Sequence, residues 1–333
     1  MGTVLTPPVD LTEDALMATL GDAWGLAATS VAYRPVGWGS HHWEVEDTEG
    51  ARWFVNVDEL ETKRHTHDES PEVAFDRLRA ALGAARALRD HGTPIVVAPE
   101  PTRSGEPLAR LSDRFGLALY TYVNGQSFSW GEFSAPDHRR ALLDLVVAVH
   151  SAPDSIRRRA MADDFAVPHR DALESGLRAD GDLDTHGPYA HRTSVLLTEN
   201  AAPIRHLLAR YDELVLACRA QPDRAVLTHG EPHPGNTMLT PDGWRLIDWE
   251  TTLVAPPERD LWNLDPGDGS ILDAYADITG VTPLPELLEL YRIRWDLSDL
   301  AVDVDRFRRP HTGTADDDQS WELLHRLVTH LGA

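Results

Sequence analysis

Residues 227–250 read LTHGEPHPGNTMLTPDGWRLIDWE, and they carry the strongest indication of the fold and of the site. The apolar run at residues 244–247 follows a Pro-Asp-Gly turn, which predicts a β-hairpin. Polar side chains flank this hairpin, because Glu231 lies five residues before Asn236 and Asp248 follows twelve residues after Asn236. The stretch therefore brings two carboxylates and one amide around a single turn of the chain.

These residue types suit one kind of chemistry. Phosphoryl transfer from ATP needs a group that orients the attacking hydroxyl and accepts its proton, and oxygen ligands that hold Mg²⁺ against the phosphates. The carboxylate of Glu231 suits the first role, and the side-chain oxygens of Asn236 and Asp248 suit the second. The stretch thus favours a metal-dependent nucleotide site, and a metal-dependent hydrolase that uses the same acids stays open as an alternative.

At these residues the chain resembles the aminoglycoside phosphotransferase and choline kinase group, whose catalytic loop reads H-G-D-x-x-x-x-N. The corresponding segment here is residues 229–236, with Glu231 in place of the family's Asp. The family's metal-binding Asp, in an I-D-F or I-D-W context, matches Asp248, and its D-P-x-x-D-L-like segment matches residues 256–261. An ordered series of motifs over about thirty-five residues is more specific than any single short motif.

The resemblance implies an α+β, bilobal, protein-kinase-like fold. Residues 1–123 would form an N-terminal nucleotide-binding lobe, a β-sheet with one main helix. Residues 124–333 would form a larger, mainly helical C-terminal lobe that carries the catalytic and acceptor-binding residues. The cofactors implied are ATP or GTP with Mg²⁺, and the implied reaction is transfer of a phosphoryl group to an alcohol.

The resemblance also assigns roles to individual residues of the loop. Glu231 would orient and deprotonate the acceptor hydroxyl, and His229 would support the loop through hydrogen bonds. Asn236 and Asp248 would hold Mg²⁺. Glu250 is expected to be an outer or second metal ligand.

The N-terminal part contains three extended runs within residues 30–57 that glycines divide, which predicts a β-meander. A glycine-rich turn lies between the first two runs, where a nucleotide-binding kinase folds a loop over the phosphates. Residues 120–125 match the hinge of the family, whose backbone reads the purine. The positions that we expect to bind the nucleotide are Gly37, Gly39, Ser40, Asn56, Tyr122 and Val123.

One expected residue is missing from the third extended run. Protein-kinase-like folds place a phosphate-contacting lysine near the end of this strand, and this chain has Asn56 there. Lys63 follows in a polar stretch that would have to fold back, so we expect Lys63 to stay away from the phosphates. Arg77 or Arg79 on the next helix, or a different use of Mg²⁺, is left as the replacement.

The other elements follow from periodicity and from Gly and Pro positions. Helices are expected at residues 11–26, 74–90, 136–150, 168–176 and 194–220. Strands are expected at residues 95–98 and 115–123, and simple loops at residues 266–270 and 314–320.

Residues 285–307 predict a long helix with proline in its first turn. Asp296, Asp299 and Asp303 share one face of that helix. In related phosphotransferases a helix in this region lines the acceptor pocket. The resemblance therefore implies that Asp296 and Asp299 bind ammonium groups while Trp295 stacks on a ring of the acceptor. A solvated helix face is the alternative interpretation.

Composition limits the possible partners. The chain of 333 residues has 54 acidic and 31 basic side chains, a net charge of −23, which disfavours binding to nucleic acid or anionic membranes. A surplus of acid can steer a cationic small molecule toward a cleft, although it also serves solubility. The only cysteine, Cys218, excludes an internal disulfide and a thiolate metal cluster. We expect a monomer or a homodimer.

The sequence also predicts a cytoplasmic protein. No apolar run approaches the roughly 20 residues that cross a bilayer. The N-terminus lacks the basic start and the unbroken apolar stretch of a secretory signal.

We therefore expect a nucleotide-dependent phosphotransferase that acts on a hydroxyl of a small cationic natural product or antibiotic. Aminoglycosides, aminocyclitols and basic nucleosides or peptides are the candidate acceptors, and resistance or self-protection is the expected purpose. A metabolic kinase for choline, homoserine or a sugar is the nearest alternative. A pseudokinase-like binding protein is another, because Glu231 and Asn56 depart from the family pattern.

Overall fold

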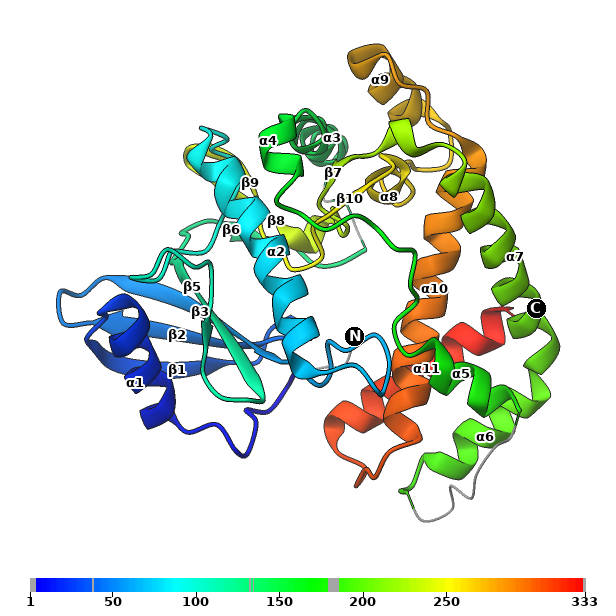
Figure 1. Ribbon diagram of the computed structural model, residues 1–333, viewed down its shortest axis with the longest axis horizontal. Helices are drawn as coiled ribbons and strands as arrows, with labels where there is room; N and C mark the ends of the chain where they lie inside the picture. Colours follow the sequence, from blue (N-terminus) through cyan, green and yellow to red (C-terminus); the bar gives the residue numbers. More distant parts are fainter. Residues whose placement is uncertain (1–3, 38, 132, 134, 179–185, 332–333) are drawn as a thin grey trace.

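The computed structural model describes residues 4–331 except residues 38, 132, 134 and 179–185. The N-terminal part is a five-stranded antiparallel sheet with strand order β1-β2-β3-β5-β4 (Figure 1). Its elements are α1 (Glu13–Trp24), β1 (Ala28–Arg34), β2 (His41–Asp47), β3 (Arg52–Glu59), α2 (Pro71–Asp90), β4 (Ala109–Arg110) and β5 (Phe115–Thr121). The predicted β-meander is confirmed as β1 to β3.

Strand β3 shows how the sheet separates its two faces. Side chains alternate along a strand, so Val55 and Val57 point to one face while Phe54, Asn56 and Asp58 point to the other. Val55 and Val57 are fully buried in the cluster that includes α1. Phe54 packs against the cluster that includes α2 and the C-terminal part. The face of β3 that carries Asn56 and Asp58 is therefore turned toward the rest of the molecule.

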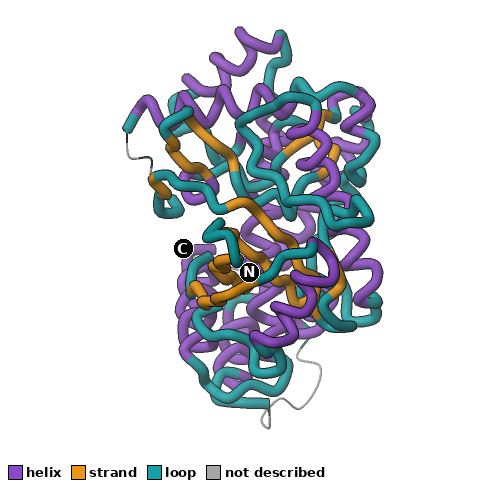
Figure 2. The backbone as a smooth tube through the Cα atoms, turned by 90° about the vertical axis from the view of Figure 1, so that its left-hand side faces the viewer, coloured by secondary structure: helices purple, strands orange, loops and turns teal. Residues whose placement is uncertain are grey.

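The C-terminal part is mostly helical, with short strand pairs inserted between the helices. The helices are α3 (Pro136–His150), α4 (Asp154–Arg157), α5 (Arg170–Leu177), α6 (Ala190–Glu199), α7 (Ala201–Arg219), α8 (Glu258–Leu261), α9 (Ser270–Thr279), α10 (Pro285–Phe307) and α11 (Ala315–Leu331). The strands are β6 (Gln126–Ser127), β7 (Val226–Thr228), β8 (Thr237–Thr240), β9 (Gly243–Leu246) and β10 (Leu253–Ala255). Figure 2 looks onto the sheet part, with helical segments extending above and below the strands.

The division proposed at residues 1–123 and 124–333 falls between β5, which ends at Thr121, and β6. Strand β6 begins at Gln126 and pairs with β8 rather than with the N-terminal sheet. Helix α10 runs through the helical part and packs against α5, α7, α8 and α11 (Figure 1). Its bounds agree with the predicted helix, and the β8/β9 hairpin confirms the predicted turn, with Thr240 opposite Gly243.

The single helix expected at residues 194–220 is wrong, because the chain breaks at Asn200 into α6 and α7. Asn200 has φ −113° and ψ 19°, outside the helical region. Pro203 lies in the first turn of α7, and a proline lacks the N–H that would continue the hydrogen-bond ladder of α6. The two helices share a hydrophobic cluster with α10.

Two shorter expectations also need correction. Residues 95–98 form only an isolated bridge between Val96 and Leu246, because prolines flank this segment on both sides. Residues 314–320 enter α11 instead of forming a loop. Asp317 accepts hydrogen bonds from the N–H groups of Gly313 and Thr314, and acidic residues are favourable in the first turn of a helix.

Within the described residues, none of the helices combines the length and the apolar character that a bilayer crossing requires.

Candidate active site

The loop between β7 and β8 carries Glu231 and Asn236, and His229 fixes its shape. His229 is fully buried. Its Nε2–H donates to the backbone oxygen of Ile247 at 2.9 Å, and its Nδ1 accepts the N–H of Glu231 at 3.2 Å. Burial lowers the pKa of His229 to about 4, so the ring is neutral and both contacts are satisfied together. His229 thus ties the loop to the segment that carries Asp248.

Asp260 of α8 holds the same loop from the other side. Its two carboxylate oxygens accept the backbone N–H groups of His229 and Gly230 at 2.8 and 2.7 Å. His150 of α3 lies 3.1 Å from the same carboxylate. Gly230 has φ +103°, and a Cβ at this position would lie 2.5 Å from the guanidinium of Arg259, so only glycine fits. The sequence match at residues 256–261 identified this segment but not its role.

Glu231 and Asn236 lie close together at the mouth of this loop. The side-chain amide of Asn236 donates to the backbone oxygen of Glu231 at 3.0 Å, which leaves the amide oxygen of Asn236 as the atom that can bind a cation. The side chain of Glu231 is 14% exposed. Burial, together with the charges of Glu250 and Asp299, raises the pKa of Glu231 to about 7.

Asp248 follows β9 with an unusual backbone conformation. Its φ is +66°, in the left-handed region that non-glycine residues seldom adopt outside functional sites. The neighbours on either side hold it, since Ile247 donates its N–H to the backbone of Asn236 at 2.9 Å and Trp249 is fully buried. Burial and then the charge of Glu231 raise the pKa of Asp248 to about 7. The fold therefore keeps Asp248 beside Glu231 at an energetic cost.

The donor set fits Mg²⁺. Glu231, Asp248 and Glu250 are largely enclosed, and burial is the main cause that raises the pKa of each; neighbouring carboxylates add to the rise, while the charge of Lys63 opposes it at Asp248 and Glu250. Such a group attracts a divalent cation. Asn236 and Asp248 offer the one or two protein oxygens that Mg²⁺ commonly uses together with phosphates and water. Among the described residues no group of three or more His, Cys, Asp or Glu forms a metal cage, and this mode of binding needs none.

Glu250 has a different neighbour from the one expected. Both of its carboxylate oxygens lie 2.7 Å from Nζ of Lys63, and the hydroxyl of Ser40 lies 3.1 Å from one of them. Lys63 also lies 3.0 Å from Asp58. The expectation that Lys63 stays away from the site is therefore wrong. The stretch after β3 folds back because two buried carboxylates there, Asp58 and Glu250, need a countercharge.

The proposed arginine replacements lie elsewhere. Arg77 pairs with Glu69 at 2.5 Å, and Arg79 pairs with Asp76 at 3.0 Å. Asn56 stands two residues before Asp58 on the same face of β3, and its buried side-chain oxygen has no hydrogen-bond partner within the described part of the chain. Asn56 therefore borders the Lys63 cluster without joining it.

The backbone that we expect to face a nucleotide belongs to the glycine-rich turn and to the segment after β5. Gly37 and Gly39 have φ +79° and +81°, and Ser40 is 3% exposed at the start of β2, whereas Trp38 lies outside the described residues. Tyr122 donates its N–H to the backbone oxygen of Arg52 at 3.1 Å, so that group is occupied. Val123 follows β5 and is half-buried. Of the two expected hinge residues, it is the one whose backbone N–H we expect to be available to a base.

An aromatic wall formed by Trp130, Trp262 and Trp295 lies beside the loop that carries Glu231. The ring of Trp295 on α10 stacks on Trp130 with centroids 6.5 Å apart and tilts against Trp262 at 5.8 Å. Trp130 in turn meets His233 of the catalytic loop edge-on at 6.2 Å. The sequence pattern indicated Trp295 but not Trp130 or Trp262, because no local spacing connects three segments that meet only in the folded chain. The wall joins α10 to the catalytic loop.

The acidic stripe of α10 is only partly solvated. Asp303 is 5% exposed, and Asp296 and Asp299 are half-buried. Burial raises the pKa of Asp296 to about 6, and the charge of Asp299 adds to it. Asp299 also acts on Glu231, so the stripe lies within electrostatic reach of the catalytic loop. A fully solvated face does not describe Asp303, whereas Asp296 and Asp299 keep part of their surface open to water.

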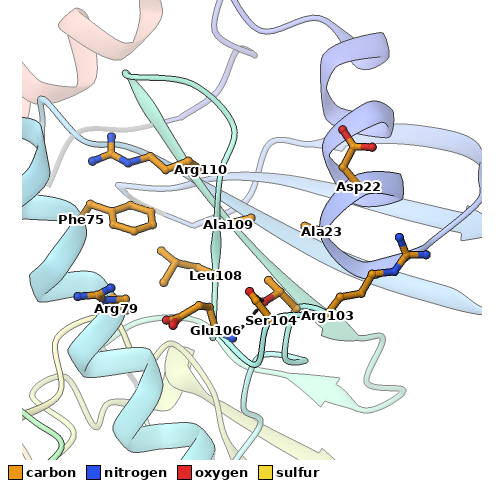
Figure 3. Close-up of a pocket in the computed structure, with 11 residues that line it drawn as sticks. Asp22, Ala23, Phe75, Arg79, Arg103, Ser104, Glu106, Leu108, Ala109 and Arg110 are labelled. Atoms are coloured by element: carbon orange, nitrogen blue, oxygen red, sulfur yellow. Dashed lines mark hydrogen bonds between the residues drawn. The ribbon is translucent and has the colours of Figure 1, made fainter.

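A separate cavity of about 430 Å³ lies in the N-terminal part (Figure 3). Residues of α1, α2 and β4 line it, and apart from Arg79, which was a candidate replacement for the strand lysine, none of the residues expected to bind nucleotide, metal or acceptor is among them. Two of its arginines are paired, Arg110 with Glu72 and Arg79 with Asp76. In Figure 3 Arg103 extends away from the other two. The cavity thus has no converging set of unpaired charges.

The five-stranded sheet, the mostly helical second part and the loop at residues 229–236 are together the features of a small-molecule phosphotransferase of the kinase-like class. The sequence profile of the phosphotransferase enzyme family matches residues 32–323, and the chain belongs to this family. Among individual proteins, it is 33% identical to Protein StrN of Streptomyces griseus over 257 residues, which cover 72% of this chain and 74% of that protein.

Solved structures show the same fold. The chain is similar to a spectinomycin phosphotransferase crystallised with ADP and spectinomycin, with a TM-score of 0.71 at 17% identity over 97% of this chain and 98% of that one. It is also similar to an amicoumacin kinase solved with AMP-PNP and Ca²⁺, with a TM-score of 0.55 at 14% identity over 96% and 93% of the chains. At these identities the solved structures establish the fold alone.

Proposed function

We propose that this protein transfers the γ-phosphoryl group of ATP or GTP to a hydroxyl of a small cationic natural product or antibiotic. The observation that carries the proposal is that Glu231 lies near two groups of residues. It is close to Asn236 and Asp248, the candidate Mg²⁺ ligands, and within electrostatic reach of Asp299 on α10. The relatives named for spectinomycin and amicoumacin support an antibiotic acceptor.

The reaction follows from these positions. The carboxylate of Glu231 accepts the proton of the acceptor hydroxyl, whose oxygen forms a bond to the γ-phosphorus as the bond to the β-phosphate oxygen breaks and the nucleoside diphosphate leaves. Mg²⁺, when bound by Asn236 and Asp248, supplies neutralisation of the phosphate charge. His229 and Asp260 keep the loop in place, so that the carboxylate meets the hydroxyl in one orientation.

The acceptor side selects for positive charge and for a ring. Asp296 and Asp299 lie on the same helix as Trp295. Their carboxylates would bind ammonium groups of the acceptor, and the indole of Trp295 would stack on a ring of the acceptor. Phosphorylation of such a molecule would serve resistance or self-protection. ATP and Mg²⁺ are abundant in the cytoplasm, where we place the protein.

The test is transfer from Mg·ATP and, separately, Mg·GTP to aminoglycosides, aminocyclitols, basic peptide and nucleoside antibiotics, choline, homoserine and sugars, with product mass as the readout. We expect one added phosphoryl group on a cationic natural product. Transfer to choline, homoserine or a sugar alone would instead indicate a metabolic kinase. Nucleotide binding without any product would favour the binding protein, and phosphate release without nucleotide would favour the hydrolase.

Removal of the metal is expected to stop the reaction. With Asn236 and Asp248 as the only assigned protein ligands, chelation of Mg²⁺ should lower turnover by at least about a hundredfold, because the phosphate charge is then unbalanced. Adding back Mg²⁺ should restore the rate. Turnover that survives the chelator unchanged would contradict the metal assignment.

Replacing Trp295 with alanine should weaken acceptor binding specifically. Loss of one aromatic face is expected to raise the acceptor KM by about tenfold, while the nucleotide KM stays within about twofold. Trp295→Phe keeps a ring and serves as the matched control, with an expected change of less than about threefold. Equal changes in both KM values would show that the substitution disturbs the fold rather than the acceptor site.

A further inference from the structure

Lys63 is the only lysine in the sequence. Of the 31 basic lysine and arginine residues, the other 30 are arginines, so this chain forms its ion pairs elsewhere with guanidinium groups. Arginine and lysine are not interchangeable, because the ammonium is compact and offers three donors around one point. A single lysine in the candidate site indicates that this position uses a compact ammonium.

A tight turn delivers Lys63 to the site. Strand β3 ends at Glu59, and Leu60 is fully buried and donates its N–H to the backbone of Arg114 at 2.9 Å. Thr62 then closes the turn with an N–H bond of 3.1 Å to the oxygen of Glu59. Arg77 of α2 binds the backbone oxygen of Lys63 at 2.7 Å. These contacts hold the lysine close to the end of the strand that lacks one.

The partners of Lys63 come from three separate segments. Asp58 is the penultimate residue of β3, Ser40 follows the glycine-rich turn, and Glu250 comes from the segment that carries Asp248. Ser40 donates to Asp58 at 2.6 Å, and Nζ of Lys63 lies 3.4 Å from the Ser40 hydroxyl. The side chain of Lys63 is 19% exposed, so it is enclosed without being fully buried. The ammonium therefore lies where the glycine-rich turn meets the metal-binding segment.

The cluster repeats a known ion pair with different residues. In protein kinases the lysine of the third strand contacts the phosphates and is held by a glutamate of the following helix. Here the glutamate in the first turn of α2, Glu72, has a side chain that is 71% exposed and pairs with Arg110. Glu250 binds the lysine instead, with both oxygens.

We propose that Lys63 is the cation that contacts the nucleotide phosphates, supplied by the β3–α2 loop in place of the missing strand lysine, and that Glu250 positions it. This inference rests on the proposed function. Glu250 is then a positioning residue, and the metal is left to Asn236 and Asp248. Asn56 faces the same side of β3 as Asp58, so a lysine at position 56 would have its head group near the same cluster.

The first test labels Lys63 without any acceptor. An acyl phosphate of ATP carries a reactive carbonyl at its phosphates. The amine of Lys63 attacks this carbonyl, an amide forms, the bond from carbonyl to phosphate breaks, ATP leaves, and the amine proton goes to solvent. Peptide mass spectrometry should find residue 63 acylated, with at least about tenfold less label under excess Mg·ATP. Label on the N-terminal amine alone, or label at residue 63 that ATP does not suppress, would overturn the proposal.

The second test moves the lysine. Lys63→Ala is expected to lower kcat/KM for the nucleotide by about a hundredfold or more, with the acceptor KM within about threefold. Adding Asn56→Lys to this variant should raise the nucleotide kcat/KM again by at least about tenfold. If Lys63 had only a structural role in its loop, a lysine at position 56 would not restore this value. Arg79→Ala, which removes an exposed pair on α2, is the matched control and should stay within about twofold.

Glu250→Gln tests the positioning role. It should reduce acylation of residue 63 and raise the nucleotide KM, whereas the acceptor KM should hold within about threefold. If Lys63→Ala does not fold, as judged by its thermal unfolding midpoint, Lys63→Arg takes its place in the kinetic comparison. A Lys63 variant that folds and keeps the nucleotide kcat/KM of the parent would overturn the proposal. The labelling needs no phosphoryl transfer, so a failed search for an acceptor leaves its outcome unaffected.

Discussion

Replacing Glu231 with glutamine is expected to reduce kcat by about a hundredfold or more, because the amide keeps the size of the side chain but cannot accept the hydroxyl proton. Nucleotide and acceptor binding should hold within about threefold, since the loop contacts of His229, Gly230 and Asn236 use backbone atoms of the segment and not the carboxylate of Glu231. Steady-state kinetics with product mass as the readout measure both quantities. Unchanged turnover would remove Glu231 from the mechanism.

Glu231→Asp completes this experiment, because it introduces the residue that the family has at this position. Shortening the side chain withdraws the carboxylate by roughly the length of one C–C bond, and a misplacement of that size can cost on the order of a hundredfold in rate. We expect a loss of about tenfold or more, smaller than that of Glu231→Gln, because the carboxylate is still present. An aspartate variant as fast as the parent would show that the loop does not depend on the longer side chain.

Replacing Asp260 with alanine is expected to have the largest effect on stability. The carboxylate is 1% exposed and accepts two backbone N–H groups and the ring of His150, all of which would lose their partner together. Leaving buried donors unsatisfied costs about 1–3 kcal/mol each, so with three donors affected the free energy of unfolding should fall by at least about 3 kcal/mol. Denaturant unfolding measures this quantity.

Asp260→Asn and Asp277→Ala are the controls for that measurement. The asparagine keeps one acceptor oxygen and should lose less stability than the alanine variant, although its activity should also fall because one loop N–H is released. Asp277 is exposed on α9, and its replacement by alanine should change the free energy of unfolding by less than about 0.5 kcal/mol. Equal losses for Asp260→Ala and Asp277→Ala would contradict the role assigned to Asp260.

The parts of the fold that were predicted correctly are those with a local cause. The β8/β9 hairpin follows from a Pro-Asp-Gly turn between short apolar runs, and α10 follows from helical spacing after a proline in the first turn. Local patterns gave the wrong prediction where one residue interrupted a helical pattern, or where the segment was too short to show a periodicity. Pro203 divides α6 from α7, and the acids near Asp317 begin a helix although they resemble a loop.

The candidate site divides in the same way. The motif of residues 229–250 placed Glu231, Asn236 and Asp248 in one neighbourhood because a hairpin brings its own ends together. The aromatic wall was only partly predictable, since Trp295 lies on a recognisable helix while Trp130 and Trp262 reach it from other segments.

The sequence by itself determined the family, the hairpin that carries the acids and the long helix beside them, because each depends on residues close together in the chain. Only the tertiary structure decided that Lys63 meets Glu250, a residue 187 positions away, and that Asp260 holds the catalytic loop. The physical reason is burial. Burying a carboxylate or an ammonium without a partner of opposite charge is unfavourable, so these groups are buried together. Only the folded chain shows which of the many charged residues form such a group.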